Sequence, residues 1–248
     1  MADTPTSPTP VAIVTGAGSG IGRATALTLS RSGLSVMLVG RRMEPLMETA
    51  AQMPEGAESI CTVADVSDPA SGQQIVSACV DRFGRLDVLV NNAALAPLLP
   101  IEKTDAATIE QVYMTNAVGP ACAIAAAWPV FIRQHAEGRM CRLGHRVVNV
   151  STLGTSDPFA GFFAYAASKA AMNVMAASCA NEGKRYGVRA FSVAPGAVET
   201  PMLRNIFSDK VLPPSRCLSP QAVAEEILAC VMGERENLNG QTIFLRAT

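Results

Sequence analysis

Tyr165 and Lys169 stand four residues apart in a run of strong helix formers without Gly or Pro, so both side chains should lie on one helix face. A phenol has an ordinary pKa of about 10 and is a poor proton donor or acceptor at neutral pH. A fixed ammonium beside it favours the phenolate and lowers that pKa. The pair could therefore act as a general acid and base, although the same spacing also occurs on many helices that have no chemical role.

A second candidate site is the glycine-rich segment from Thr15 to Gly22, which lies between a predicted strand and a predicted helix. Glycines at this place let the backbone turn sharply and approach a pyrophosphate. The helix N-terminus then offers free N–H groups and the positive end of its dipole to the anion. The strand–turn–helix context favours dinucleotide binding over a plain glycine-rich turn.

The end of the second predicted strand indicates which dinucleotide binds. An acid there would bond the ribose 2′-hydroxyl of NAD(H), but the chain has Gly40 followed by Arg41. A guanidinium can bind a 2′-phosphate through paired hydrogen bonds, so NADP(H) is favoured. NAD(H) stays possible if Arg41 is merely exposed. Asp65, which ends the third predicted strand before Val66, could bond the adenine amino group or cap the next helix.

The elements that must position these residues alternate along the chain. Short apolar strands without a polar alternation, separated by helices, indicate parallel strands buried on both faces. Right-handed crossovers then give an α/β fold, a single Rossmann-type doubly wound domain with a seven-stranded, mostly parallel sheet flanked by helices on both faces. Strands are predicted at 11–14, 36–39, 59–63, 88–90, 146–150, 188–193 and 241–245. Helices are predicted at 21–32, from the end of the second strand through 47, at 69–83, at 106–134 with a break near 119, at 163–186 and at 220–232.

Composition fits one such domain. The 248 residues are 49% apolar and 17% charged, and a formal net charge of −1 gives no global field that would recruit nucleic acid or an anionic membrane. Seven cysteines without a Cys-x-x-Cys pair are typical of small buried thiols in a reducing compartment, which predicts a cytoplasmic protein. The two histidines are not at ligand spacing, so no metal site is predicted.

Four segments carry predictions of their own. Residues 1–10 should be a flexible tail ahead of a single domain over 11–248, and the irregular stretch 202–219 should be a substrate lid. The apolar stretch 117–132 is broken by Gly and Pro and is interpreted as a core or interface helix too short to cross a membrane. A basic cluster is interpreted as a solvated surface loop; it contains Arg133, His135, Arg139, Arg142, His145 and Arg146.

Taken in order, the motifs resemble those of the short-chain dehydrogenase/reductase family, in the branch whose chains are about as long as this one. The resemblance extends from Val11 to Leu245. The matching signatures are Thr15-Gly16-x-x-x-Gly20-Ile21-Gly22, Asn91-Asn92-Ala93, Asn116, Tyr165-x-x-x-Lys169, and Pro195-Gly196 with Thr200.

The resemblance implies NAD(P)(H)-dependent, reversible hydride transfer between nicotinamide and a ketone or secondary alcohol, with Tyr165 as general acid and base. It also implies that Lys169 bonds the nicotinamide ribose and that Asn116 helps to hold a water that links Lys169 to solvent. The cofactor-binding residues that it implies are Gly16, Ser19, Gly20, Ile21, Arg41, Asp65, Val66, Asn92, Ala93, Tyr165, Lys169, Pro195, Gly196, Val198 and Thr200.

The chain departs from the family pattern at three places. Ala94 replaces a usual Gly, and Phe191 replaces a usual Asn. The third departure concerns the catalytic hydroxyl, because counting thirteen residues back from Tyr165 gives Thr152, whereas residue type favours Ser151. Neighbouring side chains at a strand end point to opposite faces, so only one can face a substrate carbonyl. Spacing favours Thr152.

The segments expected to line the substrate site are rich in Leu, Met and Phe, which predicts a mostly apolar small-molecule carbonyl or alcohol. Family members usually assemble as tetramers or dimers, so a homo-oligomer without nucleic-acid or membrane partners is expected. Two alternatives remain open, a 3-oxoacyl-type reductase acting on a carrier-bound substrate and a dinucleotide-binding regulator without turnover. A sugar-nucleotide epimerase is less favoured because the chain ends with the seventh predicted strand.

Overall fold

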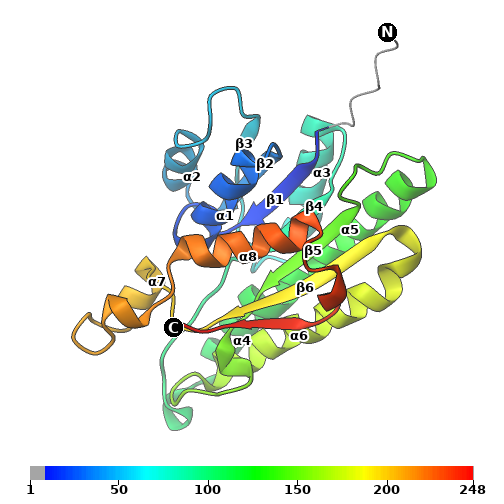
Figure 1. Ribbon diagram of the computed structural model, residues 1–248. Helices are drawn as coiled ribbons and strands as arrows, with labels where there is room; N and C mark the ends of the chain where they lie inside the picture. Colours follow the sequence, from blue (N-terminus) through cyan, green and yellow to red (C-terminus); the bar gives the residue numbers. More distant parts are fainter. Residues whose placement is uncertain (1–8, 248) are drawn as a thin grey trace.

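The short apolar segments predicted as strands form one sheet in the computed structural model of the protein, which describes residues 9–247 (Figure 1). Apolar runs without alternation pair as parallel strands because both of their faces are covered. The predicted flexible tail, 1–10, falls almost wholly outside the described residues. The strands are β1 (Val11–Thr15), β2 (Ser35–Gly40), β3 (Ser59–Val63), β4 (Val88–Asn91), β5 (His145–Val150), β6 (Val188–Pro195) and β7 (Thr242–Leu245).

Every strand pair in this sheet is parallel, and the strand order is β3-β2-β1-β4-β5-β6-β7. The predicted doubly wound fold is confirmed, with a sheet that is parallel throughout rather than mostly parallel. The order reverses where β1 pairs with β4, although β2 and β3 separate them in the sequence. In sheets of this kind ligands bind beyond the carboxyl ends of the strands at such a reversal, which places the expected site at the ends of β1 and β4.

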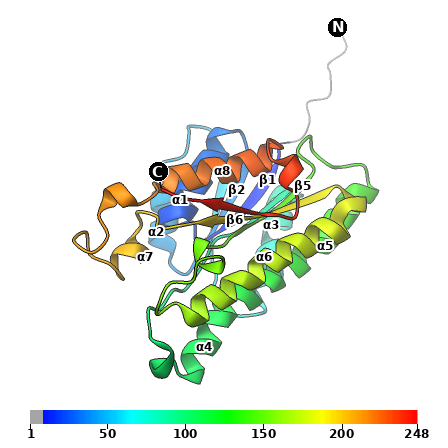
Figure 2. The ribbon, with the colours of Figure 1, turned by 60° about the horizontal axis from the view of Figure 1, so that its bottom comes forward.

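Helices cover both faces of the sheet, as predicted (Figure 2). They are α1 (Gly20–Arg31), α2 (Met43–Ala50), α3 (Ser71–Phe83), α4 (Ala106–Tyr113), α5 (Gly119–Ala136), α6 (Phe163–Gly183), α7 (Pro201–Arg204) and α8 (Pro220–Met232). Residues of α1, α2 and α8 fill the core on one face, and residues of α3, α5 and α6 fill it on the other. The predicted boundaries differ by a few residues, and β3 and α8 match at both ends.

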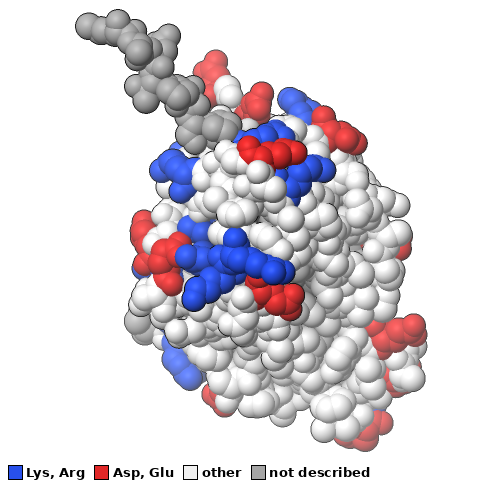
Figure 3. Space-filling model, turned by 90° about the vertical axis from the view of Figure 1, so that its right-hand side faces the viewer, with Lys and Arg blue, Asp and Glu red and all other residues white. Residues whose placement is uncertain are grey.

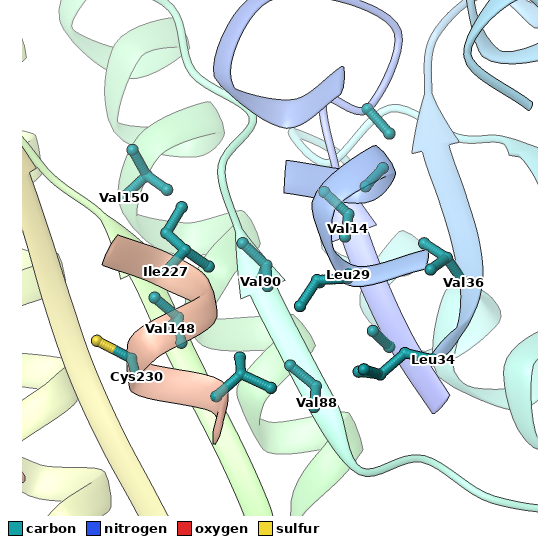
Figure 4. Packing of buried hydrophobic residues seen from close by; sticks show 14 of the residues in the cluster. Val14, Leu29, Leu34, Val36, Val88, Val90, Val148, Val150, Ile227 and Cys230 are labelled. Carbon is teal, nitrogen blue, oxygen red and sulfur yellow. The ribbon is translucent and has the colours of Figure 1, made fainter. Parts of the chain in front are cut away.

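The face covered by α1 and α8 shows how the valine-rich strands are used. Val14, Val90 and Val148 of three adjacent strands pack with Leu29 of α1 and Ile227 of α8, and none of these side chains is exposed (Figure 4). Full burial of such a side chain stabilises the fold by roughly 1.5–3 kcal/mol. This packing fixes the strand ends that carry the site. All seven cysteines are free, and Cys79, Cys141, Cys179 and Cys230 are buried.

The helix break predicted near Gly119 is a π-helical segment, Met114–Val118, so the helix continues through it from Ala106 to Ala136. Gly119 is needed there because a Cβ would collide with the carbonyl oxygen of Val66. The prediction that this stretch is too short to cross a membrane is wrong in its length argument, because the helix as a whole has 31 residues and contains an 18-residue window of mean hydropathy 1.4. However, Ala127 and Phe131 on its inner face are fully buried against the sheet, as is typical of a core helix.

The amino-terminal ends of two central strands are joined by a buried ion pair. Arg85 donates to both carboxylate oxygens of Asp87 at 2.7 Å, and Asp87 also accepts a hydrogen bond from the backbone N–H of Val11. The carboxylate therefore ties the start of β1 to the start of β4. The chain that leads into β5 lies at the same ends of the strands, because Arg139 donates to the carbonyl of Gly84.

The interpretation of the basic cluster as a solvated loop is wrong for two of its members. His145 is fully buried and Arg146 is 7% exposed. Arg146 donates to the carbonyl of Val231 and pairs with Glu236 at 2.7 Å, so it anchors the end of α8 to β5. Figure 3 shows the side of the molecule where α5 and α6 end, with basic side chains gathered beside acidic ones next to a broad uncharged area.

Burial of His145 is expected to make the protein sensitive to acid. Its ring stacks on Phe131 with centroids 4.6 Å apart, and neither ring nitrogen has a hydrogen-bond partner. Burial, ahead of the opposing effect of Asp87, lowers the pKa of His145 from 6.5 to about 4. Between these values the unfolded chain binds the extra proton, so folding free energy is lost as pH falls from 6.5 to 4, up to about 3 kcal/mol.

His145→Phe should reduce that loss, measured by urea unfolding at pH 7 and at pH 4.5. His135→Phe is the control, since it changes the other histidine and leaves His145 intact. An acid-induced loss as large in His145→Phe as in the wild type would assign the sensitivity to other groups.

Candidate active site

The glycine-rich turn between β1 and α1 forms a cradle in which two glycine positions have no room for a side chain. Gly16 has a φ of +67°, and a Cβ on it would lie 2.7 Å from Nδ2 of Asn92. A Cβ on Gly22 would collide with the carbonyl oxygen of Gly16. Ser19 precedes α1 without a side-chain capping hydrogen bond, so the N–H groups of the first helical turn face the cradle uncapped. These features fit a dinucleotide pyrophosphate.

A hydroxyl at the end of β1 joins this turn to β4. Oγ1 of Thr15 accepts hydrogen bonds from the N–H groups of Asn92 (2.9 Å) and Ala93 (3.1 Å). Nδ2 of Asn92 donates to the carbonyl of Thr15 at 2.8 Å. The bonds fix the two strand ends at the topological switch point. The motif predicted no positioning role for Thr15. Its hydroxyl, at the end of an otherwise apolar strand, is the sequence feature that could have indicated this role.

The end of β2 carries no acid. A Cβ at Gly40 would lie 3.2 Å from Cδ2 of the buried Leu46, so a larger residue would press on the core. Arg41 is exposed at this point. Asp65 accepts hydrogen bonds from the N–H (3.0 Å) and hydroxyl (2.8 Å) of Ser67, and the Ser67 N–H, ahead of the more distant charge of Arg41, lowers the pKa of Asp65. Asp65 does not cap α3, whose N-cap is residue 70.

Arg23 holds the cradle to α2, which sequence reasoning did not anticipate. Its Nη2 donates to the carbonyl of Gly18 at 2.6 Å and pairs with Glu48 at 2.7 Å, and its Nε donates to the hydroxyl of Thr49. Arg23 follows directly after the last glycine of the motif, and a cation at that position could have indicated a hydrogen bond to the backbone of the turn.

Tyr165 and Lys169 lie on the first turns of α6, above the end of β5. Nζ of Lys169 donates to the carbonyl of Val150 at 2.6 Å and lies 3.3 Å from the sulfur of Met172. Burial lowers the pKa of Lys169 to about 7 and raises the pKa of Tyr165 to about 12. The structure differs here from the expected effect of the ammonium. The group that lowers the pKa of Tyr165 is the hydroxyl of Thr152, and burial outweighs it.

The two candidate hydroxyls face opposite sides of the chain after β5, as strand geometry requires. Ser151 is buried, and its Oγ donates to the carbonyl of Lys169 at 3.2 Å. The hydroxyl of Thr152 lies beside the phenol of Tyr165 and accepts from the N–H of Gly154. The serine hydroxyl is thus bonded to the α6 backbone, and the threonine hydroxyl adjoins the phenol.

Asn116 lies in the π-helical segment and joins the loop after β4 to α6. Its Oδ1 accepts from the N–H of Leu95, and its Nδ2 donates to the carbonyl of Leu95, both at 2.8 Å. Nδ2 also donates to the hydroxyl of Ser168 at 3.0 Å, which in turn donates to the carbonyl of Tyr165. Asn149 was also not anticipated, and its amide links Asn91 to the carbonyl of Met172.

The segment after β6 closes over the cradle. Gly196 donates to the carbonyl of Leu245, which extends the pairing of β6 with β7, and Val198 forms a bridge with Leu218. The side chain of Thr200 accepts from the N–H of Leu203 and caps α7, and its methyl lies 3.0 Å from the Cβ position of Gly20. Phe191, the replacement for a usual Asn, is fully buried in the core cluster on the side of α8.

Comparisons with known proteins point in one direction. A family model described as short chain dehydrogenase matches residues 10–211. Levodione reductase of Leifsonia aquatica is 35% identical over 222 residues, which cover 88% of this chain and 78% of the relative. Sulfoacetaldehyde reductase 2 of Chromohalobacter salexigens is 33% identical over 192 residues, which cover 77% of this chain and 73% of the relative.

Solved structures agree with these matches. A crystal structure of levodione reductase superposes with a TM-score of 0.86 at 29% identity and 97% coverage of both chains. A crystal structure of 3-ketoacyl-(acyl-carrier-protein) reductase from Brucella melitensis, complexed with NADH, superposes with a TM-score of 0.87 at 24% identity, covering 97% of this chain and 98% of that one. At that identity the second likeness is one of fold.

Proposed function

This chain belongs to the short-chain dehydrogenase family, and from that premise we propose that it is an NAD(P)(H)-dependent oxidoreductase acting reversibly on a mostly apolar ketone or secondary alcohol. The observation that carries the proposal is the position of the Tyr165 phenol beside the Thr152 hydroxyl, on the same edge of the sheet as the glycine cradle. The names of its relatives levodione reductase and sulfoacetaldehyde reductase support reduction of a carbonyl.

The side chains supply proton transfer and charge stabilisation, while a bound nicotinamide dinucleotide supplies the hydride. The hydroxyls of Thr152 and Tyr165 would donate hydrogen bonds to the carbonyl oxygen, where negative charge develops. Burial holds the pKa of Tyr165 near 12, so the phenol keeps its proton at neutral pH and can give it from Oη. Asn116 and Ser168 hold the loop after β4 against α6 and so fix the position of the phenol.

The cofactor we propose is NADP(H), bound by the cradle and by the side chains that the sequence indicated. Its pyrophosphate would lie over Gly16, Ser19, Gly20 and Ile21, and its adenosine 2′-phosphate against Arg41. The remaining contacts we assign to Asp65, Val66, Asn92, Ala93, Tyr165, Lys169, Pro195, Gly196, Val198 and Thr200.

We also propose a cytoplasmic homodimer or homotetramer. The free cysteines support a reducing compartment. The outward faces of α5 and α6 support assembly, because they carry partly exposed apolar side chains such as Trp128 and Ile132 and the largely exposed Val174.

The test is NADPH oxidation against a panel of uncharged ketones, with a 3-oxoacyl thioester in a separate arm and NADPH affinity measured by fluorescence titration. Turnover of uncharged ketones is expected. Turnover of the thioester alone would make the carrier-bound alternative correct. Tight NADPH binding without turnover of any carbonyl would instead support the alternative of a dinucleotide-binding regulator.

Arg41→Asp should reverse the cofactor preference. The substitution removes paired charge-assisted hydrogen bonds and places a like charge beside the 2′-phosphate, so NADPH affinity should fall by at least about 10-fold while NADH affinity is kept or improved. Titrations at one fixed salt concentration measure both. Arg31→Asp, at the exposed far end of α1, makes the same change of net charge and should preserve the preference. A wild type that binds NADH more tightly than NADPH would contradict the NADP(H) assignment.

A further inference from the structure

Aromatic rings from two segments far apart in the sequence meet beside Tyr165. The ring of Phe162 has its centroid 5.3 Å from that of Tyr165 and 6.5 Å from that of Phe207. The ring centroid of Phe159 lies 6.0 Å from that of Phe162, in a tilted pair, and 5.9 Å from that of Phe207, in an edge-on pair. Phe159 and Phe162 precede α6, whereas Phe207 belongs to the segment after α7 that extends beyond the carboxyl ends of the strands (Figure 1). We call these three phenylalanines the aromatic cluster.

The cluster borders the open side of the site rather than the core. Phe159 is 60% exposed, and Phe162 and Phe207 are half-buried. Leu98 adds an aliphatic wall, because its side chain lies against Gly161 and the next N–H, that of Leu99, donates to the Gly161 carbonyl at 2.9 Å. Leu98 is itself 38% exposed. Large apolar side chains gathered at one exposed place indicate a binding surface, whereas isolated ones do not.

Arg204 fixes the segment that carries Phe207. Its guanidinium binds both carboxylate oxygens of Glu199 and pairs with Asp209 at 3.0 Å. It also donates to the carbonyls of Phe207 (3.3 Å) and Leu212 (2.9 Å), and the hydrogen bond with Glu199 raises its pKa. One cation thus pairs with Glu199 before this segment and with Asp209 within it. The backbone at Phe207 is held in place, and none of these three charges is left to face the rings.

We propose that the aromatic cluster is a subsite for an uncharged aromatic ring of the carbonyl substrate, and that Arg204 is the positioning residue that holds Phe207 in it. The inference rests on the proposed function and names its substrate class. Edge-on and tilted ring pairs at centroid distances of about 4.5–7 Å are favourable beyond the area they bury, and the cluster offers a ligand ring the same geometry. A carboxylate or phosphate in that place would lose its hydration and gain no counter-charge from the cluster.

The test compares kcat/KM, with NADPH, for benzyl methyl ketone, hexan-2-one and a ketone bearing a carboxylate in place of the ring. We expect the wild type to favour the aryl ketone over hexan-2-one by about 10-fold and to use the carboxylate ketone worst. Phe207→Leu and Phe162→Leu keep apolar volume and remove a ring, so each should abolish most of the preference for the aryl ketone over hexan-2-one, chiefly through the KM of the aryl ketone. Phe207→Tyr keeps the ring and should keep the preference.

Two controls separate the subsite from general damage. Phe163→Leu removes an exposed ring that forms no aromatic pair among residues 9–247 and should preserve the preference. Arg204→Met should lower the preference in the wild type and have no further effect on it in Phe207→Leu, because Arg204 acts through Phe207. A purely structural role would lower the melting temperature and the turnover of all ketones equally in both backgrounds.

Equal use of aryl and aliphatic ketones, or a preference that survives both leucine variants, would overturn the subsite while leaving the oxidoreductase proposal intact. A preference for a quaternary-ammonium ketone would also overturn it, since the rings would then be a cation site. Tight NADPH binding with no reduction of any ketone would instead refute the proposed function.

Discussion

Tyr165→Phe is expected to lower kcat for ketone reduction by about 10²- to 10⁴-fold, the range typical of losing a positioned general acid. The variant keeps the ring against Phe162 and removes only the hydroxyl that would carry the proton and one of the two hydrogen bonds to the carbonyl oxygen. Stopped-flow hydride transfer and steady-state turnover, with NADPH bound at saturation, measure the effect on chemistry rather than on cofactor affinity.

Tyr186→Phe is the matched control. Tyr186 lies in the 3₁₀ turn after α6, where its ring contacts His135 and the guanidinium of Arg185, far along the helix from the cradle. Removing its hydroxyl should leave kcat at the wild-type value. If Tyr165→Phe turned over at a near-normal rate, proton transfer would have to come from another group and the mechanism would be wrong.

Thr152→Val should have the second largest effect, a fall in kcat of about 10²- to 10³-fold, because it removes one donor to the developing oxyanion. Valine keeps the β-branched shape, so packing around the residue is preserved. The loss should appear mainly in kcat, since the hydrogen bond strengthens as charge develops on the oxygen.

Ser151→Ala is the contrasting variant. It removes the hydrogen bond to the carbonyl of Lys169, which should cost roughly 0.5–1.5 kcal/mol of stability and leave most of the activity. A large loss of activity in Ser151→Ala together with an active Thr152→Val would assign the catalytic hydroxyl to Ser151 and contradict the count of thirteen residues from Tyr165.

Periodicity predicted most of the fold because the interactions that decide it are local in the sequence. The apolar runs at 11–14 and 36–39 show no alternation, which indicates parallel strands with two covered faces, and every residue of both runs is buried. The helix at 220–232 begins with a Ser and a Pro and ends before a Gly, which are start and stop signals with a direct physical cause. The placement of Tyr165, Lys169 and Thr152 near one strand end follows from the same local rules.

The remaining features depend on contacts between distant residues. Nothing near Gly119 in the sequence shows that the helix continues through a π-helical segment or that Gly119 packs against the backbone of Val66. In the sequence Arg146 cannot be told from a solvated cation, because its ion-pair partner Glu236 lies far away along the chain. The low pKa of Lys169 results from burial by the whole fold. Arg204 holds the segment around Phe207 through partners on both sides of it in the sequence, Glu199 and Leu212. Spacing alone contains none of this information.

The strand order has a consequence for the chain as it leaves the ribosome. The first three strands can pair as β3-β2-β1 once residue 63 has emerged, but the other side of β1 must wait for β4, at residues 88–91. During that interval β1, an apolar strand that is interior in the finished sheet, is an edge strand with an open row of N–H and C=O groups, on which other chains can pair and aggregate. Pausing of translation between residues 63 and 91 should therefore lower the yield of native protein more than pausing near the C-terminus, where only the edge strand β7 remains to be added.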